Sequence, residues 1–203
     1  MDYAGLLRQE LTMRNVSYAV DHGRPRATIS GEQGVVVYRL SECGRQHGNF
    51  IRASYRAILS RSEWRRRLLK VHPHCRRALP RTEFIWRELD SCMSSDALLM
   101  NVFCYPGITN NWDLASVLGI GPGAIPDFGF RPRVPLTANL VDKTEVDMRL
   151  DGVLFEAKLT EPGFQVQDAR LVERYCHFKE VFDCRRLPPA CLLRHISSLI
   201  DER

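Results

Sequence analysis

The chain has 203 residues, of which 44% are hydrophobic and 26% are charged, and its formal charge is +5. This near-average globular composition excludes disordered, collagen-like and coiled-coil proteins. The longest apolar run is far shorter than the ~20 residues that cross a bilayer, and the first residues do not have the pattern of a signal peptide. We therefore expect a cytoplasmic protein that makes no membrane contact.

Positive charge is concentrated between residues 39 and 87. This segment has 13 basic and three acidic side chains, a net charge of +10, whereas the rest of the chain sums to −5. Arginine supplies 25 of the 29 basic residues, and its planar guanidinium suits phosphate. The segment is a candidate nucleic-acid surface; the alternative is a set of solvated helix faces. The residues we expect to contact nucleic acid are Arg65, Arg66, Arg67, Lys70, Arg76 and Arg77.

Helical spacing of apolar residues predicts a series of helices in the first half of the chain. Ser62 is expected to cap one helix, and the run from Ser94 to Asp96 is expected to cap another. Trp64, Trp86 and Trp112 are expected to be core anchors. The histidines are expected at the surface or at helix caps. The predicted helices span about 2–14, 50–59, 62–70, 82–92 and 95–104.

The segment 105–135 contains five prolines, and Gly119–Gly123 within it is expected to be a loop. Its stretch Gly119–Gly123 is glycine-rich, but prolines follow it where a nucleotide-binding loop would open a helix, so dinucleotide binding is rejected. A later helix is expected at about 166–182, with Tyr175, Phe178 and Phe182 as its buried stripe.

Seven irregularly spaced cysteines favour reduced thiols over disulfides. His72, His74 and Cys75 with a later cysteine offer a weaker alternative, a zinc-stabilised interaction domain. The paired spacings that are typical of structural zinc sites are missing from the sequence.

Two runs of alternating polarity flank Asp151-Gly152, a pattern that predicts a β-hairpin with a two-residue type I′ turn. Counting outward from this turn places Asp147 opposite Glu156. Two carboxylates ~5 Å apart repel by roughly 3 kcal/mol at an effective dielectric near 20, and a divalent cation would turn this repulsion into coordination. Lys158 lies on the same face. The opposite, apolar face would hold Val146, Met148, Leu150, Val153, Phe155 and Ala157.

The arrangement Asp147-x8-Glu156-x-Lys158 across a hairpin resembles the catalytic motif of the PD-(D/E)XK, or restriction-endonuclease-like, nuclease superfamily. The stretch from Thr144 to Gln165 looks like a bacterial branch usually described as restriction-endonuclease-like. The resemblance covers about residues 94–183. It implies an α+β (α/β) fold whose central mixed sheet is flanked by helices, preceded here by a basic helical region. We therefore expect two parts, residues 1–93 and a nuclease-like core over 94–203.

The resemblance also implies a chemistry. Asp147, Glu156 and the backbone carbonyl of Ala157 would bind Mg²⁺ or Mn²⁺, Lys158 would position the attacking water, and Gln165 could orient water or phosphate. An upstream helix of the superfamily often adds an acid, for which the sequence leaves three candidates open, Glu83, Glu88 and Asp96. The superfamily core also expects a last strand, which only residues 191–196 could supply, so truncation of the C-terminus stays open.

The expected function is therefore metal-dependent hydrolysis of phosphodiester bonds, with DNA as the partner and a homodimer left open. The alternative is a catalytically inactive nucleic-acid-binding protein with a nuclease-like fold. At the hairpin itself, the competing interpretation is a solvated polar face on which Lys158 pairs with Glu145 in a surface salt bridge of little energetic value.

Overall fold

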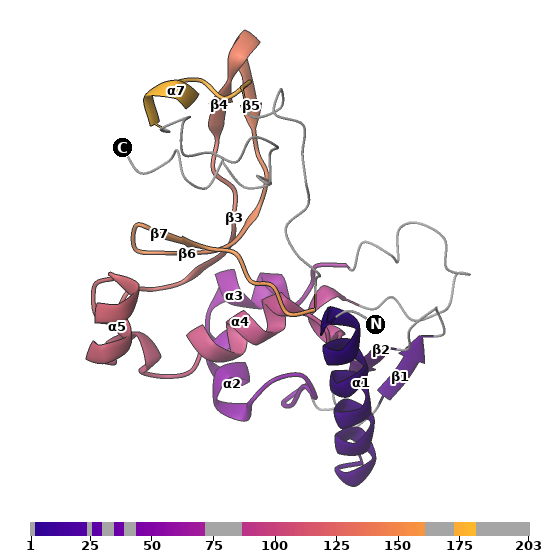
Figure 1. Cartoon of the computed structure of the whole chain (residues 1–203). Coiled ribbons are helices and arrows are strands. Elements are labelled where there is room, and N and C mark those ends of the chain that lie inside the picture. Colours follow the sequence, from indigo (N-terminus) through magenta and orange to yellow (C-terminus); the bar gives the residue numbers. More distant parts are fainter. Residues whose placement is uncertain are drawn as a thin grey trace.

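The computed structural model describes residues 3–23, 26–29, 35–38, 44–71, 87–160 and 173–181. Helices α2, α3 and α4 lie together against one small sheet, α5 lies at the end of that sheet, and the hairpin of β4 and β5 projects away from it (Figure 1). The elements are α1 (Tyr3–Asp21), β1 (Arg26–Ile29), β2 (Val35–Tyr38), α2 (Arg52–Ser60), α3 (Ser62–Arg67), η2 (Glu88–Asp90), α4 (Ser95–Phe103), η3 (Ile108–Asn110), α5 (Trp112–Leu118), β3 (Asp127–Phe130), β4 (Val134–Leu136), η4 (Thr137–Asn139), β5 (Leu140–Asp142), β6 (Val146–Leu150), β7 (Val153–Phe155) and α7 (Phe178–Val181).

The principal sheet has the order β3–β6–β7, so β6 is its central strand. Met148 lies opposite Phe155 and Leu150 opposite Val153, which confirms the predicted hairpin and its register. Between the two turn residues only Asp151 has a positive φ, 57°. A type I′ turn needs positive φ at both, so the predicted turn type was wrong and the pattern is that of type II′.

All strand pairs within the described ranges are antiparallel: β1–β2, β3–β6, β4–β5 and β6–β7. The mixed sheet that we expected is therefore not present in this part of the chain. The mixture of helices and antiparallel strands places the fold in the α+β class.

The main hydrophobic core lies between the sheet and helices α2, α3 and α4. Met148 and Leu150 are fully buried from β6, and Ile58 is fully buried from α2. Each such side chain contributes roughly 1.5–3 kcal/mol of burial free energy. The indole N–H of Trp64 donates to the Pro126 carbonyl at 2.8 Å, so this tryptophan is the predicted core anchor. The same cluster contains residues on both sides of the expected 93/94 boundary.

The sequence predicted α2, α3 and α4 to within a few residues but missed α5. The sequence predicts no helix between residues 105 and 135, where five prolines lie. Asn111 nevertheless caps a helix there, its side-chain oxygen accepting from the Leu114 N–H at 2.9 Å, and Gly119 ends the helix in the left-handed region with φ 66°. After Gly119 the chain continues into β3 and not into a helix. This agrees with the rejection of a nucleotide-binding loop at this place.

Other local predictions were wrong. Residues 87–92 contain only the short η2, because Arg87 is held in a bridge to Val71; residues 82–86 lie outside the described ranges. Ser62 is the first residue of α3, and Arg61 occupies the cap position. Tyr175 bridges to Leu136 instead of continuing a helix into Phe178.

The aromatic and histidine predictions were also mixed. Trp112 is 72% exposed at the start of α5, so it is not a core anchor. His47 is buried beside Asp90, with Nε2 and Oδ1 3.1 Å apart, although we expected the histidines at the surface or at helix caps. Cys92, Cys104 and Cys176 are free thiols, and burial raises the pKa of the Cys104 thiol.

No helix in the described ranges is long and apolar enough to cross a membrane.

Candidate active site

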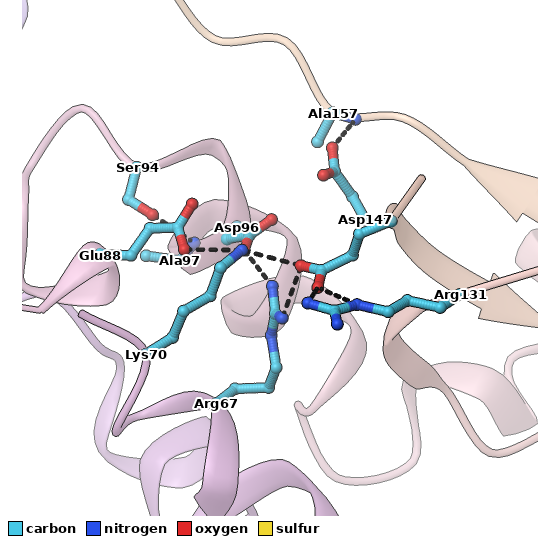
Figure 2. A network of polar contacts seen from close by, with 10 residues as sticks. Arg67, Lys70, Glu88, Ser94, Asp96, Ala97, Arg131, Asp147 and Ala157 are labelled. Carbon is cyan, nitrogen blue, oxygen red and sulfur yellow. Dashed lines mark hydrogen bonds and ion pairs between the residues drawn. The ribbon is translucent and has the colours of Figure 1, made fainter. Parts of the chain in front are cut away.

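The site is centred on Asp147, the second residue of the central strand β6, which points away from the apolar face. Its Oδ2 accepts a hydrogen bond from the backbone N–H of Ala157 at 2.7 Å (Figure 2). β6 buries Val146, Met148 and Leu150 on the other face, so strand alternation forces Asp147 onto the polar one.

The electrostatic surroundings of Asp147 are unusual for a surface aspartate. Its pKa is raised to about 7, chiefly by burial and also by the charges of Asp96 and Glu156, while the Ala157 N–H and the charge of Lys158 oppose the shift. The carboxylates of Asp96 and Glu156 therefore lie close enough to Asp147 to disfavour its ionisation. Perturbed carboxyl groups of this kind cluster at functional sites.

Of the three candidate upstream acids, the structure describes two, and they have different surroundings. Asp96, on the first turn of α4, acts directly on Asp147. Glu88 instead pairs with Lys70, its Oε2 2.8 Å from Nζ. Glu83 lies outside the described residues. Ser94 caps α4 by accepting from the Ala97 N–H at 3.1 Å, as the sequence predicted, and the cap fixes the turn that carries Asp96.

Glu156 and Lys158 follow the end of β7 rather than forming part of it. The ladder ends at Phe155, so the predicted strand pair between Asp147 and Glu156 does not form, and the Ala157 N–H bonds the Asp147 side chain instead. The Lys158 ammonium donates to Glu156 Oε1 at 2.5 Å. The surface pair between Lys158 and Glu145 is not the arrangement observed, because Glu145 has other partners.

Glu145 accepts from three cations next to the site. Lys70 Nζ lies 2.7 Å and Arg67 Nη1 2.8 Å from its Oε1, and Arg131 Nη2 lies 2.9 Å from its Oε2. Burial alone would raise the pKa of Glu145, but the hydrogen bonds from Lys70 and Arg67 outweigh it and hold the pKa at about 2. The sequence did not lead us to Glu145 as a network residue, although its place on the face of Asp147 was visible in the alternation.

The predicted nucleic-acid contacts divide into two groups. Arg65 and Arg66 are exposed and, with Ser62 and Leu69, line an open surface hollow of about 430 Å³. Arg67 and Lys70 turn inward and pair with Asp96, Glu145 and Glu88. Arg67 and Lys70 therefore form ion pairs within the protein, which the charge pattern did not indicate. Arg76, Arg77 and Gln165 lie outside the described residues, as do His72, His74 and Cys75 of the zinc alternative.

The carboxylates of Asp96, Asp147 and Glu156 and the Ala157 carbonyl are oxygen donors of the kind that Mg²⁺ and Mn²⁺ prefer. When all three acids are ionised, their negative charges repel one another in half-buried surroundings. This repulsion is one of the causes of the raised pKa of Asp147. In the arrangement described here each acid bonds a group of the chain itself, and no three Asp, Glu, His or Cys side chains in the described ranges are grouped as a ligand set.

The observed helices and antiparallel sheets are of the α+β class, which is consistent with a restriction-endonuclease-like protein. The chain belongs to the family described as restriction endonuclease associating with ARP, which matches residues 14–199. Comparisons with curated proteins and with solved structures return no match. Membership confirms the resemblance seen in the hairpin motif and indicates a nuclease-like function.

Proposed function

We propose that this protein is a metal-dependent nuclease that hydrolyses phosphodiester bonds in DNA. The observation that carries the proposal is the environment of Asp147: a half-buried carboxylate on a central strand, with a pKa near 7, two further carboxylates acting on it and a lysine beside them. Such a cluster is costly for folding and has a direct use in phosphodiester chemistry.

Asp147, Glu156 and the Ala157 carbonyl would hold Mg²⁺ or Mn²⁺, with Asp96 as the additional acid. The bound ion would polarise the scissile phosphate and lower the pKa of a coordinated water. Lys158, whose ammonium is held by Glu156, would orient that water and neutralise charge on the phosphate oxygens in the transition state. Gln165 keeps its predicted role in orienting water or phosphate.

DNA as the substrate rests on the exposed arginines. Arg65 and Arg66 lie on α3, the helix that also sends Arg67 toward the site, so a phosphate backbone held by this surface would pass near Asp147. The family's description names ARP as an associated protein, and we extend that association to this chain as part of the proposal.

The experiment is cleavage of supercoiled and linear DNA by the purified full chain. We expect cleavage with Mg²⁺ or Mn²⁺, none with EDTA, and a strong loss in Lys158→Ala. Lys179→Ala is the control, because this exposed lysine lies on α7. Cleavage that is independent of metal, or full activity of Lys158→Ala, would reject the mechanism.

A second candidate is a nucleic-acid-binding protein that does not cleave. The observation in its favour is that each acid of the site already bonds a donor of the chain. This candidate predicts salt-dependent DNA binding that Glu156→Ala leaves unchanged, together with no cleavage in either metal. The two candidates therefore differ in the same assay.

A further inference from the structure

Strands β3 and β4 pair with β6 and β5 to form one continuous two-stranded ribbon, which runs from the candidate site to the projecting hairpin (Figure 1). Phe130 lies opposite Val146 where the β3–β6 ladder ends, and Val134 lies opposite Asp142 where the β4–β5 ladder begins. Both strands advance by four residues between these two pairs. The register therefore passes from one ladder to the other without an inserted residue.

Two cross-strand pairs lie between these ladders. Counting along the register places Arg131 opposite Glu145, and the ion pair between Arg131 Nη2 and Glu145 Oε2, at 2.9 Å, confirms the count. The next pair outward is Arg133 opposite Lys143. Residues directly opposite one another in an antiparallel pair share a face, and so do alternate residues of one strand. These four side chains therefore belong to the face that carries Asp147.

Burial agrees with this assignment of faces. Pro132 and Val134 are buried, whereas Arg131, Arg133 and Lys143 are exposed. The exposed face of the ribbon therefore carries a row of charged side chains that leads outward from the site.

Arg133 and Lys143 are two like charges opposite one another. The other charged pairs on this face are matched in sign: Arg131 with Glu145, and Arg149 with Asp127 at 3.2 Å. Among the described residues no acid pairs with Arg133 or Lys143. Asp142 belongs to the other face and accepts from Thr144 Oγ1 at 2.6 Å. Like charges placed directly opposite destabilise a ribbon, so this pair has a physical reason to meet an anion from outside.

We propose that Arg133 and Lys143 form a clamp for a phosphate group of the DNA backbone, and that the duplex lies along the exposed face of the ribbon. The inference rests on the proposed function and deepens it by adding a second DNA contact beside α3. Phosphate fits the pair because the arginine fork and the lysine ammonium both donate to its oxygens.

The clamp lies at a definite distance from the candidate site. Lys143 precedes Asp147 by four residues, roughly 13 Å along an extended strand. One DNA strand covers this length with about four nucleotides. The clamp therefore holds the backbone about four nucleotides from the phosphate that lies at Asp147.

The experiment measures the affinity of the full chain for a labelled DNA duplex by fluorescence anisotropy in EDTA, at several salt concentrations. We expect Lys143→Gln to weaken binding roughly tenfold at low salt and to reduce the slope of log affinity against log salt by about 1. The double variant with Arg133→Gln should reduce the slope by about 2. Arg14→Gln, on α1 and 75% exposed, is the control and should leave the slope unchanged.

Lys143→Glu separates the clamp from an ordinary surface charge. It makes the pair with Arg133 one of opposite charges, so the melting temperature should rise by roughly 2 °C. DNA binding should nevertheless fall further than in Lys143→Gln, because the new carboxylate repels phosphate. Circular dichroism melting measures the first effect and establishes that each variant is folded. A lower melting temperature in Lys143→Glu would contradict the facing pair of cations.

Two binding results would overturn the inference: unchanged affinity and slope in folded Lys143→Gln and in the double variant, or an equal fall in Arg14→Gln. If the wild type cleaves DNA while the clamp variants bind as it does, only the clamp is rejected. If the wild type binds DNA through the clamp but does not cleave it with either metal, the proposed cleavage falls and the clamp stands. If the wild type neither binds nor cleaves DNA, both fall.

Discussion

Asp147 and Glu145 lie two positions apart in the chain, and their pKa values shift in opposite directions. Asp147 is surrounded by carboxylates and has a pKa of about 7, whereas Glu145 is surrounded by cations and has a pKa of about 2. The surroundings of Asp147 disfavour its negative charge, whereas those of Glu145 stabilise it. Both features can be tested through the pH dependence of stability.

The first prediction concerns Asp147→Asn. The protonated form of Asp147 is favoured in the folded state, so its stabilising contribution is complete below pH 3.8 and is lost as the pH rises through about 7. Asparagine keeps an acceptor for the Ala157 N–H but cannot ionise. In EDTA, Asp147→Asn should therefore raise the free energy of unfolding at pH 8 by at least about 1 kcal/mol and leave it nearly unchanged at pH 4.

Urea unfolding at the two pH values measures this difference. A variant less stable than the wild type at pH 8 would show that the carboxylate is stabilised by its surroundings rather than strained by them.

The second prediction concerns Glu145→Gln and has the opposite sign. The pKa of Glu145 is depressed, so its contribution is present above pH 4.5 and is lost as the pH falls through about 2. At pH 7 the substitution should cost about 3 kcal/mol, because it also leaves Arg67 and Lys70 with less compensation.

The loss should shrink in acid. The exposed pair of Glu10 with Arg14 supplies the control, and Glu10→Gln should change the stability by no more than about 0.5 kcal/mol. An equal cost for the two substitutions at pH 7 would contradict the ion-pair network.

At the scale of elements, the site depends on the first turn of α4 and on the hairpin of β6 and β7. Ser94→Ala removes the cap bond to the Ala97 N–H and should lower the free energy of unfolding by about 1 kcal/mol. Ser116→Ala, on the exposed side of α5, is the comparison and should have almost no effect. If urea unfolding shows equal effects for both, the cap does not stabilise α4.

The elements that the sequence predicted well are those with a local physical cause. The alternation around Asp151-Gly152 sets the hairpin register, and the cap run before Asp96 sets the start of α4. The missed α5 shows the limit of such rules, since no helix was predicted in this proline-containing stretch although Asn111 and Gly119 form both ends of one.

The candidate site was predictable only in part. Asp147, Glu156 and Lys158 lie within one hairpin and its following residues, so spacing could bring them together. Asp96 and Arg67 join them through tertiary packing, and three acids were equal candidates from the sequence. Of three successive arginines, Arg67 points inward because it lies on the same face of α3 as Trp64. That face is buried because the sheet packs against it, which is a matter of tertiary structure.

At the scale of the whole molecule, a single core joins the helices of the basic segment to the sheet of the site. Arg65 and Arg66 are exposed on that common body. Reversing both to glutamate should weaken DNA binding at low salt and reduce the slope of log affinity against log salt by roughly 2, about one for each phosphate that an arginine no longer neutralises. Arg14→Glu, on α1 and 75% exposed, is the control. Fluorescence anisotropy at several salt concentrations measures the slope, and an equal change in the control would remove α3 from the DNA surface.

The most direct test of the metal-dependent site is the nicking of supercoiled plasmid in Mg²⁺ by three proteins: wild type, Asp147→Asn and Asp127→Asn. Asp127 lies on the neighbouring strand β3, is 53% exposed and pairs with Arg149 at 3.2 Å, so its variant controls for loss of a carboxylate from the same sheet. We expect the wild type and Asp127→Asn to nick at similar rates and Asp147→Asn to fall to background while remaining at least as stable as the wild type at pH 8. Nicking by Asp147→Asn at the wild-type rate would contradict the assignment of the active site.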